Sequence, residues 1–272
     1  MTLSPSEVRI DRRLAADMPV GVFDSGIGGL SVLNALRAAL PHERFIYFAD
    51  TAHAPYGERS DGHVADRTCT VARQLVETRG IKALVVACNT ATAAAIHLLR
   101  AEHPGLPLIG LEPALKPAVA WSRTRRIAVF ATRGTVNSRK FQSLHEAMAG
   151  QADFRVVACD GLAGAIERDD GDEISMLCAR YATAAGPFGV APGQIDTLVL
   201  GCTHYPLVGA ALRRHTGDAV RFIDTGEPVA QQTARLLGAA SLLAPARAGD
   251  ISLTGSGDPA ALQAAASRWL AG

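Results

Sequence analysis

Two cysteines occupy the same kind of position in this chain, at the end of a predicted strand and directly before a predicted helix. Cys88 follows the apolar run ALVVA and precedes an alanine-rich segment. Cys202 follows TLVLG and precedes Thr203 and His204, after which Pro206 presets a first helical turn. In an open α/β sheet, the carboxyl ends of the strands form the usual ligand crevice, and helix N-termini there offer unpaired backbone donors to an anion. We therefore expect both thiols to face a binding site.

Two thiols that face one cleft could invert the configuration of a carbon atom. Removing a proton beside a carboxylate and returning it on the opposite face requires a base and an acid, which exchange roles when the direction reverses. A free thiol has a pKa of about 8.5, so the thiolate costs only about 2 kcal/mol near neutral pH, and a nearby donor or helix N-terminus can offset this cost. The paired positions of Cys88 and Cys202 would supply the two faces.

The other cysteines lack such a junction and are expected to pack in the core: Cys69, Cys159 and Cys178. The chain has five cysteines without CxxC or metal-binding spacing and without a secretion signal, which indicates free thiols rather than a disulfide framework. For Cys88 and Cys202 themselves, the plain alternative is a small buried apolar residue at a strand end.

Short apolar runs alternate with helical patterns along the chain, which is typical of βαβ units and a mostly parallel sheet. In the first half, strands are predicted at 19–24, 44–50, 83–88 and 107–112, with helices near 29–39, 61–79 and 90–103. In the second half, strands are predicted at 126–132, 154–160, 197–202 and 221–226, again with helices between them. A helix near 227–240 and a strand-helix tail from 251 are expected to pack on the first half.

The two halves match segment by segment, which indicates an internal duplication. VGVFDSG corresponds to IAVFATRG, FIYFADT to FRVVACD, ALVVACN to TLVLGCT and LIGLEPA to FIDTGEP. The predicted fold is α/β, with two pseudo-symmetric lobes that each contain a mostly parallel sheet flanked by helices, and with the active site in the cleft between them. Turn-rich segments near 112–117 and 224–228 divide the chain. The predicted limits are a flexible N-terminal arm at 1–18, a first lobe at 19–112 plus 225–272, and a second lobe at 113–224.

Length and composition favour a cytoplasmic enzyme with a small-molecule substrate. The chain has 272 residues, 48% of them hydrophobic, so one large domain or two smaller ones can bury a core. The formal net charge is +1 and the charges are interspersed, which gives no reason to expect nucleic acid or a membrane surface as partner. No apolar run reaches the roughly 18 residues that span a bilayer, and residues 1–18 lack a signal-peptide core.

Five motifs in this order resemble the glutamate racemase family: VFDSGIGGLSVL, FADTAHAPYGERS, VVACNTA, ATRGTVNS and VLGCTHYPL. The resemblance extends from Val20 to Leu237. It implies interconversion of L- and D-glutamate by a two-base thiol mechanism that supplies D-glutamate for peptidoglycan. It also implies that no metal and no organic cofactor takes part, and it leaves a possible homodimer open.

The resemblance also implies roles for individual residues. Cys88 would take the α-proton from D-glutamate and Cys202 the α-proton from L-glutamate, with Asp24 assisting the first thiol and His204 the second. Asp50 and Glu167 would lie close to the reacting centre. The implied substrate contacts come from four of these motifs: Asp24 and Ser25; Pro55, Tyr56 and Gly57; Asn89 and Thr90; and Thr203 and His204.

Plainer interpretations stay open for several of these residues. Asp24 and Ser25 with the glycines that follow could form only a tight turn and a helix cap. These glycines do not form a dinucleotide fingerprint, because Ser31 stands where GxGxxG requires glycine. Asp50 could cap a loop, Glu167 could be a solvated helix residue, and His204 could be a surface histidine near a helix start.

Three other functions also stay open. A racemase for another acidic amino acid, such as aspartate, would use both thiols. A thiol-dependent decarboxylase or lyase on a related fold would need only one of them. A binding or scaffold protein would hold a carboxylate ligand without exchanging its proton.

Overall fold

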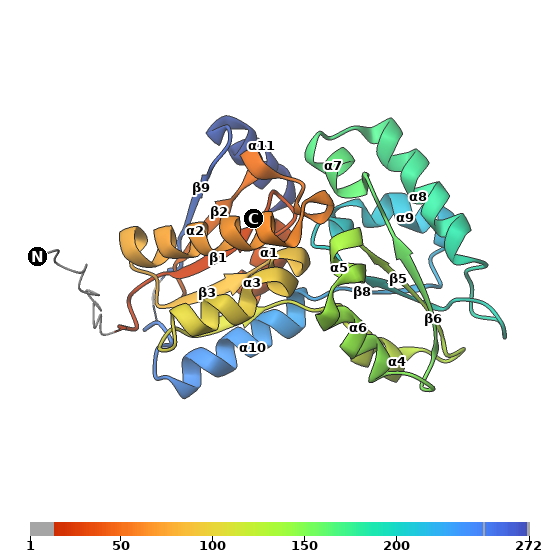
Figure 1. The fold of residues 1–272 in the computed structure, drawn as a ribbon, viewed down its shortest axis with the longest axis horizontal. Coiled ribbons are helices and arrows are strands. Elements are labelled where there is room, and N and C mark those ends of the chain that lie inside the picture. The colour runs from red at the N-terminus through yellow and green to blue at the C-terminus, as the bar shows by residue number, and fades with distance from the viewer. Residues whose placement is uncertain (1–13, 247, 271–272) are drawn as a thin grey trace, which may run out of the picture.

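The computed structural model describes residues 14–246 and 248–270, which fold around two parallel sheets placed side by side (Figure 1). The first sheet has the strand order β4-β3-β1-β2-β9, and all of its neighbouring strands run parallel. Its strands are β1 (Val20–Asp24), β2 (Phe45–Ala49), β3 (Ala83–Val86), β4 (Leu108–Gly110) and β9 (Ile251–Gly255). We call this sheet and the helices packed on it the first lobe.

The second sheet has the order β6-β5-β7-β8 and is also parallel throughout. Its strands are β5 (Arg126–Ala131), β6 (Asp153–Ala158), β7 (Thr197–Leu200) and β8 (Arg221–Ile223). This sheet and its helices form the second lobe. The orders β4-β3-β1-β2 and β8-β7-β5-β6 correspond strand by strand to the duplicated sequence segments, which supports the internal duplication.

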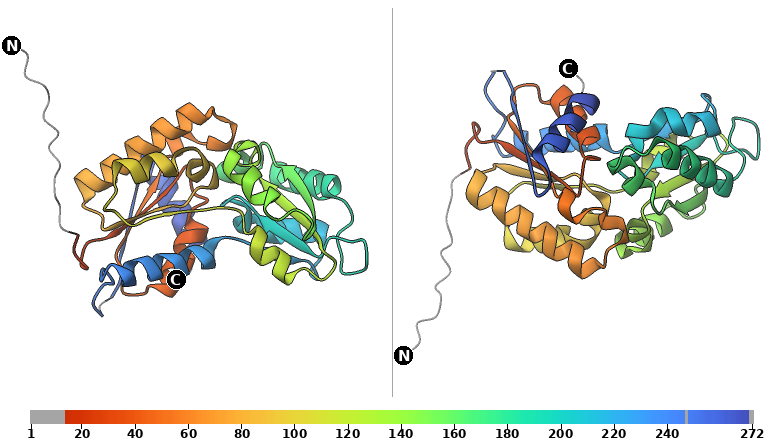
Figure 2. Two further views of the ribbon diagram at one scale, coloured as in Figure 1. Left: turned by 60° about the horizontal axis from the view of Figure 1, so that its bottom comes forward. Right: turned by 90° about the horizontal axis from the view of Figure 1, so that it is seen from above.

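Helices cover both faces of each sheet (Figure 2). On the first lobe, α1 (Leu30–Ala39) and α10 (Gly226–Ala239) pack together on one face, and α2 (Asp61–Arg79) and α3 (Asn89–Glu102) cover the other. The tail helix α11 (Pro259–Trp269) contacts β9 and α1. The helices of the second lobe are α4 (Leu115–Trp121), α5 (Arg133–Asn137), α6 (Arg139–Glu146), α7 (Leu162–Glu167), α8 (Gly171–Ala185) and α9 (Gly209–Thr216). Single-turn 3₁₀ helices lie at Thr51–His53, Tyr56–Glu58 and Tyr205–Val208.

The strands are apolar on both faces because both faces are buried. In β1, Val20 and Val22 join one core cluster, and Phe23 joins the cluster beneath α2 and α3. The first of these clusters continues into the second lobe through Phe130 and Leu198, so the two lobes share part of one core. The other three cysteines, which are Cys69, Cys159 and Cys178, are buried free thiols as predicted.

The ends of the chain fit the predicted architecture where they are described. Residues 1–13 of the predicted N-terminal arm lie outside the described residues, and Leu14 packs against the core. The tail strand β9 pairs with β2 at the edge of the first sheet. The predicted lobe limits stay a prediction. In the structure, β4 ends at Gly110 and β8 ends at Ile223. Among the described helices, none has the length and apolar character that a bilayer crossing requires.

Candidate active site

Both paired cysteines line one small cavity between the lobes, at the carboxyl ends of the two sheets. Cys88 follows β3 and Cys202 follows β7, and each side chain is only 6% exposed. The cavity has a volume of about 20 Å³. Its lining residues are Ser25, Pro55, Tyr56, Gly57, Cys88, Asn89, Thr90, Thr132, Ala163, Cys202, Thr203 and His204. The structure thus brings together most of the residues that the sequence singled out.

Cys88 is held at the N-terminus of α3 and is an uncharged thiol. It is the N-cap residue of this helix, and its Sγ accepts a hydrogen bond of 3.5 Å from the backbone N–H of Ala91. Its Sγ also lies 3.7 Å from Ser25 Oγ. Burial, followed by the nearby carboxylate of Asp24, raises the pKa of the Cys88 thiol well above its usual value. Cys88 is therefore suited to donate a proton.

Asp24 lies behind this thiol at the end of β1 and is completely buried. Its Oδ2 accepts hydrogen bonds from the backbone N–H groups of Gly26 at 3.2 Å and Gly29 at 2.9 Å. Its Oδ1 lies 3.5 Å from Thr203 Oγ1 of the second lobe. Burial raises the pKa of Asp24 to about 6, although His204 and the two backbone donors oppose the shift. Asp24 does not line the cavity itself.

A different arrangement supports Cys202. Its Sγ lies 3.5 Å from His204 Nδ1, and His204 Nε2 lies 2.5 Å from Glu167 Oε1. Burial opposes a charge on His204, but hydrogen bonding and charge from Cys202 and Glu167 outweigh it and hold the pKa of His204 well above its usual value. The imidazole is therefore a cation between a sulfur and a carboxylate. An imidazolium beside a thiol is the setting in which thiolates occur in proteins.

The glycine-rich turn after β1 packs directly on this chain of groups from the opposite lobe. The N–H of Ile27 donates to Glu167 Oε1 at 2.7 Å. A Cβ atom on Gly26 would lie 1.7 Å from Glu167 Oε1, and one on Gly28 would lie 2.4 Å from His204 Nδ1. Glycine at both positions therefore allows the turn to approach Glu167 and His204 closely. The turn thus does more than cap a helix.

The remaining polar wall of the cavity is partly unsatisfied. Asn89 is 4% exposed, and neither atom of its side-chain amide has a hydrogen-bond partner among the described residues. Thr90 Oγ1 lies 2.9 Å from Thr132 Oγ1 across the two lobes. Buried polar groups without partners are costly, so the free amide indicates a polar ligand at this wall.

Asp50 contacts a residue that lines the cavity but does not line it itself. Its carboxylate accepts hydrogen bonds from Tyr56 OH at 2.6 Å and from Arg67. Glu167 likewise lies behind His204. The structure therefore places both carboxylates next to residues that line the cavity rather than at its surface.

Sequence reasoning missed Thr132 and Ala163. Thr132 follows β5 in the motif ATRG and corresponds to Ser25 in the duplication, so the repeat could have revealed it. Ala163 carries no chemical signal. Among the described residues, no group of three or more His, Cys, Asp or Glu side chains is arranged to hold a metal ion.

The chain is similar in sequence and in structure to proteins of known function. The family model described as Asp/Glu/Hydantoin racemase matches residues 30–233. A glutamate racemase from Ralstonia pickettii is 47% identical over 249 residues, which cover 92% of this chain and 86% of the relative. The crystal structure of glutamate racemase isoform RacE1 from Bacillus anthracis superposes with a TM-score of 0.80 at 29% identity, covering 93% of this chain and 94% of that one. Glutamate racemase from Francisella tularensis in complex with D-glutamate gives a TM-score of 0.79 at 26% identity, covering 94% of both chains.

Proposed function

This chain belongs to the Asp/Glu/Hydantoin racemase family, and from that premise we propose that it interconverts L- and D-glutamate with Cys88 and Cys202 as the two proton carriers. The observation that carries this proposal is the single cavity lined by both thiols, one from each lobe of a duplicated fold. The relatives at 43–47% identity are glutamate racemases, which favours glutamate over aspartate as substrate.

The surroundings of the two thiols support opposite starting roles. Cys202 Sγ lies 3.5 Å from His204 Nδ1, which is placed to exchange a proton with it, whereas Cys88 is an uncharged thiol. We infer that L-glutamate reacts with the state in which Cys202 is the base and Cys88 is the acid. In this state Cys202 removes the α-proton of L-glutamate, and Cys88 returns a proton to the opposite face. The product is D-glutamate, with Cys202 protonated and Cys88 ionised. D-glutamate reacts with this second state in the reverse sense.

Polar groups of the cavity wall would hold the two carboxylates of the substrate. The free amide of Asn89, the hydroxyls of Thr90, Thr203 and Ser25, and the backbone N–H groups at the start of α3 all face this site or border it. Because a closed site excludes bulk water, these contacts are stronger there than in solution. They would stabilise the negative charge that develops when the α-carbon loses its proton.

The wider role follows from the same proposal. D-glutamate made by this reaction would serve peptidoglycan synthesis in the cytoplasm. A homodimer stays a prediction of the family resemblance.

The proposal is tested by proton exchange in deuterated water with the single variants Cys88→Ala and Cys202→Ala. Neither variant should racemise glutamate. The thiol that remains can remove and return a proton on one face only, so Cys202→Ala should incorporate deuterium into D-glutamate and Cys88→Ala into L-glutamate, without inversion. The matched control is Cys178→Ala, which changes a buried cysteine away from the cavity and should racemise at the parent rate.

Two results would contradict the proposal. One is a single cysteine variant that keeps the parent rate of inversion. The other is release of carbon dioxide from glutamate, which would indicate a lyase or decarboxylase. An aspartate sample run in parallel separates the two acidic substrates.

A further inference from the structure

Arg67 and Asp50 form a well-aligned ion pair beside the cavity. Its Nη2 donates to Asp50 Oδ1 at 2.9 Å and its Nε donates to Asp50 Oδ2 at 3.0 Å. This is the two-pronged geometry in which guanidinium and carboxylate bind most specifically. The Asp50 side chain is fully buried, and that of Arg67 is 25% exposed.

The same carboxylate also fixes Tyr56. The phenol of Tyr56 donates to Asp50 Oδ2 at 2.6 Å, and the Tyr56 ring is buried 6.2 Å from the ring of Phe23. Because the hydroxyl is engaged by Asp50, Tyr56 contributes its ring and backbone to the cavity wall rather than a proton. Asp50 thus connects a residue of α2 with a residue of the cavity.

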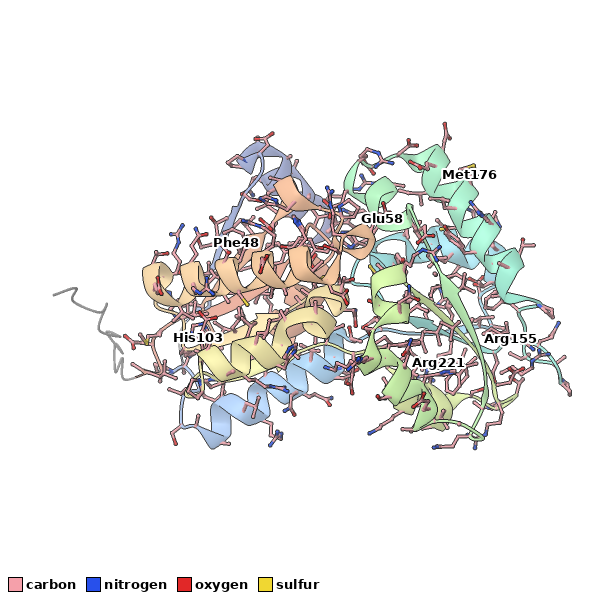
Figure 3. The ribbon with its side chains drawn as sticks, viewed as in Figure 1. Phe48, Glu58, His103, Arg155, Met176 and Arg221 are labelled. Carbon is pink, nitrogen blue, oxygen red and sulfur yellow. The ribbon has the colours of Figure 1, made fainter. Side chains whose placement is uncertain are left out.

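The position of Tyr56 determines that of Gly57 as well. A Cβ atom on Gly57 would lie 2.6 Å from Thr132 Cβ, so this backbone rests directly on the second lobe. One residue further, Glu58 Oε1 accepts a hydrogen bond of 3.2 Å from the N–H of Gly161, and Figure 3 shows Glu58 at the junction of the lobes. A shift of Tyr56 would therefore displace a wall that both lobes share.

We propose that Arg67 is a positioning residue for substrate binding, which acts through Asp50 and Tyr56 to hold residues 55–57 against the cavity. The inference rests on the proposed racemase function. Burial alone would raise the pKa of Asp50, but the hydrogen bonds from Arg67, Tyr56 and Ser256 outweigh it and lower that pKa, so the carboxylate stays charged and keeps both partners. Arg67 itself does not line the cavity.

The position of this network determines which kinetic constant should change. Residues 55–57 carry no proton in the reaction, so their displacement weakens substrate binding and leaves the two thiols in place. The two enantiomers have equal free energy, so any variant must lower kcat/KM equally in both directions. For Arg67→Gln we expect KM to rise about tenfold for both L- and D-glutamate, as for loss of hydrogen bonds to a charged group, with kcat within about twofold of the parent.

The experiment compares Arg67→Gln and Arg67→Lys with Arg73→Gln. Arg73 lies on the same helix and pairs with Glu102 at the surface, so its replacement should leave both constants unchanged. Lysine keeps the charge but not the two-pronged geometry, and Arg67→Lys should recover part of the lost affinity.

A double-variant cycle then tests the route through Tyr56. Tyr56→Phe removes the phenol that binds Asp50, and it should raise KM by itself. If Arg67 acts through this contact, adding Arg67→Gln to Tyr56→Phe should raise KM by much less than it does in the parent. Should Arg67→Gln fail to fold, the same cycle is measured with Arg67→Lys in its place.

Some outcomes would overturn the inference while the proposed function stands. These are a parent enzyme that racemises glutamate together with an Arg67→Gln variant whose KM stays within twofold, or whose kcat falls at constant KM. Fully additive effects of the two replacements would do the same. A parent enzyme without racemase activity would instead contradict the proposed function.

Discussion

The two thiols have equivalent positions in a duplicated fold but unlike neighbours. Cys202 has a histidine cation two residues along its own chain, and Cys88 has a buried carboxylate behind it. The duplication therefore conserves where the sulfur atoms stand and not which titratable groups lie beside them. In the proposed reaction each thiol acts as base in one direction and as acid in the other, so each would exchange its proton beside different neighbours.

The charge on Asp24 gives a testable consequence for stability. Burial raises its pKa from 3.8 to about 6, so the folded protein binds the Asp24 proton more tightly than the unfolded chain. This contribution to stability is complete below about pH 4 and is lost as the pH rises to about 6. Asp24→Asn lacks the titration. Its free energy of unfolding, relative to the parent, should therefore increase by up to about 3 kcal/mol between pH 4 and pH 7.

Urea unfolding at several pH values in this range measures the difference. The control is Asp218→Asn, which changes an exposed aspartate and should give a constant difference from the parent. A constant difference for Asp24→Asn as well would contradict a raised pKa at this site.

At the level of residues, the sequence alone predicts a site residue where a reactive or polar side chain also stands at the end of a strand. Cys88, Cys202 and Asn89 are recognisable because reactive or polar side chains at a strand-to-helix junction are unusual. Arg67 could not be found in this way, because an arginine on a polar helix normally points to solvent. Only the tertiary structure shows that Asp50 is within its reach.

At the level of elements, the predicted strands are all present, and most are one to three residues shorter than expected. The β3 strand ends at Val86 rather than at position 88, because Ala87 and Cys88 already leave the sheet to begin α3. The order of strands within each sheet could not be read from local pattern, since pairing joins segments that are distant in sequence. The sequence repeat shows which strand of the first sheet corresponds to which strand of the second. The order of the strands within each sheet depends on tertiary packing.

A buried ion pair at the opposite end of the first sheet tests how these elements are held together. Lys82 precedes β3 and its Nζ lies 2.6 Å from Glu43 Oε2, with both side chains almost fully buried. Glu43 Oε1 also accepts a hydrogen bond from the N–H of Ala244, and Lys82 Nζ donates to the carbonyl of Ala16. The pair thus joins segments from both ends of the chain to the centre of the sheet.

Removing one partner should be costly because it leaves the other charge buried and unpaired. We expect Lys82→Met to lower the free energy of unfolding by about 3–5 kcal/mol. The double variant Lys82→Met with Glu43→Leu should recover most of this loss, since it removes both charges. Urea unfolding measures both effects, and kcat/KM should stay at the parent value because the pair lies at the amino ends of the strands. A loss below about 1 kcal/mol for Lys82→Met would contradict this account.

At the level of the whole molecule, the lobes meet closely around the site. Ser31 Oγ of α1 donates to the carbonyl of Thr203 at 2.9 Å, and Arg268 of α11 pairs with Asp169 of the second lobe. A cavity of about 20 Å³ has room for about one water molecule. Glutamate is several times larger. We therefore expect the lobes to move apart to admit substrate, with the chain bending in the connections after β4 and β8.

Lobe separation can be followed by alkylation of the buried cysteines. Cys88 and Cys202 become accessible when the lobes part, whereas Cys178 lies inside the second lobe and requires unfolding. Opening of the lobes around the cavity exposes less surface than unfolding of the second lobe, so alkylation of Cys88 and Cys202 should depend on urea less steeply than alkylation of Cys178. Glutamate at about one hundred times its Kd should slow alkylation of Cys88 and Cys202 by about a hundredfold. Mass spectrometry of the alkylated peptides distinguishes the sites. If the rates at Cys88 and Cys202 rose with urea in parallel with Cys178, substrate entry would require unfolding rather than a hinge.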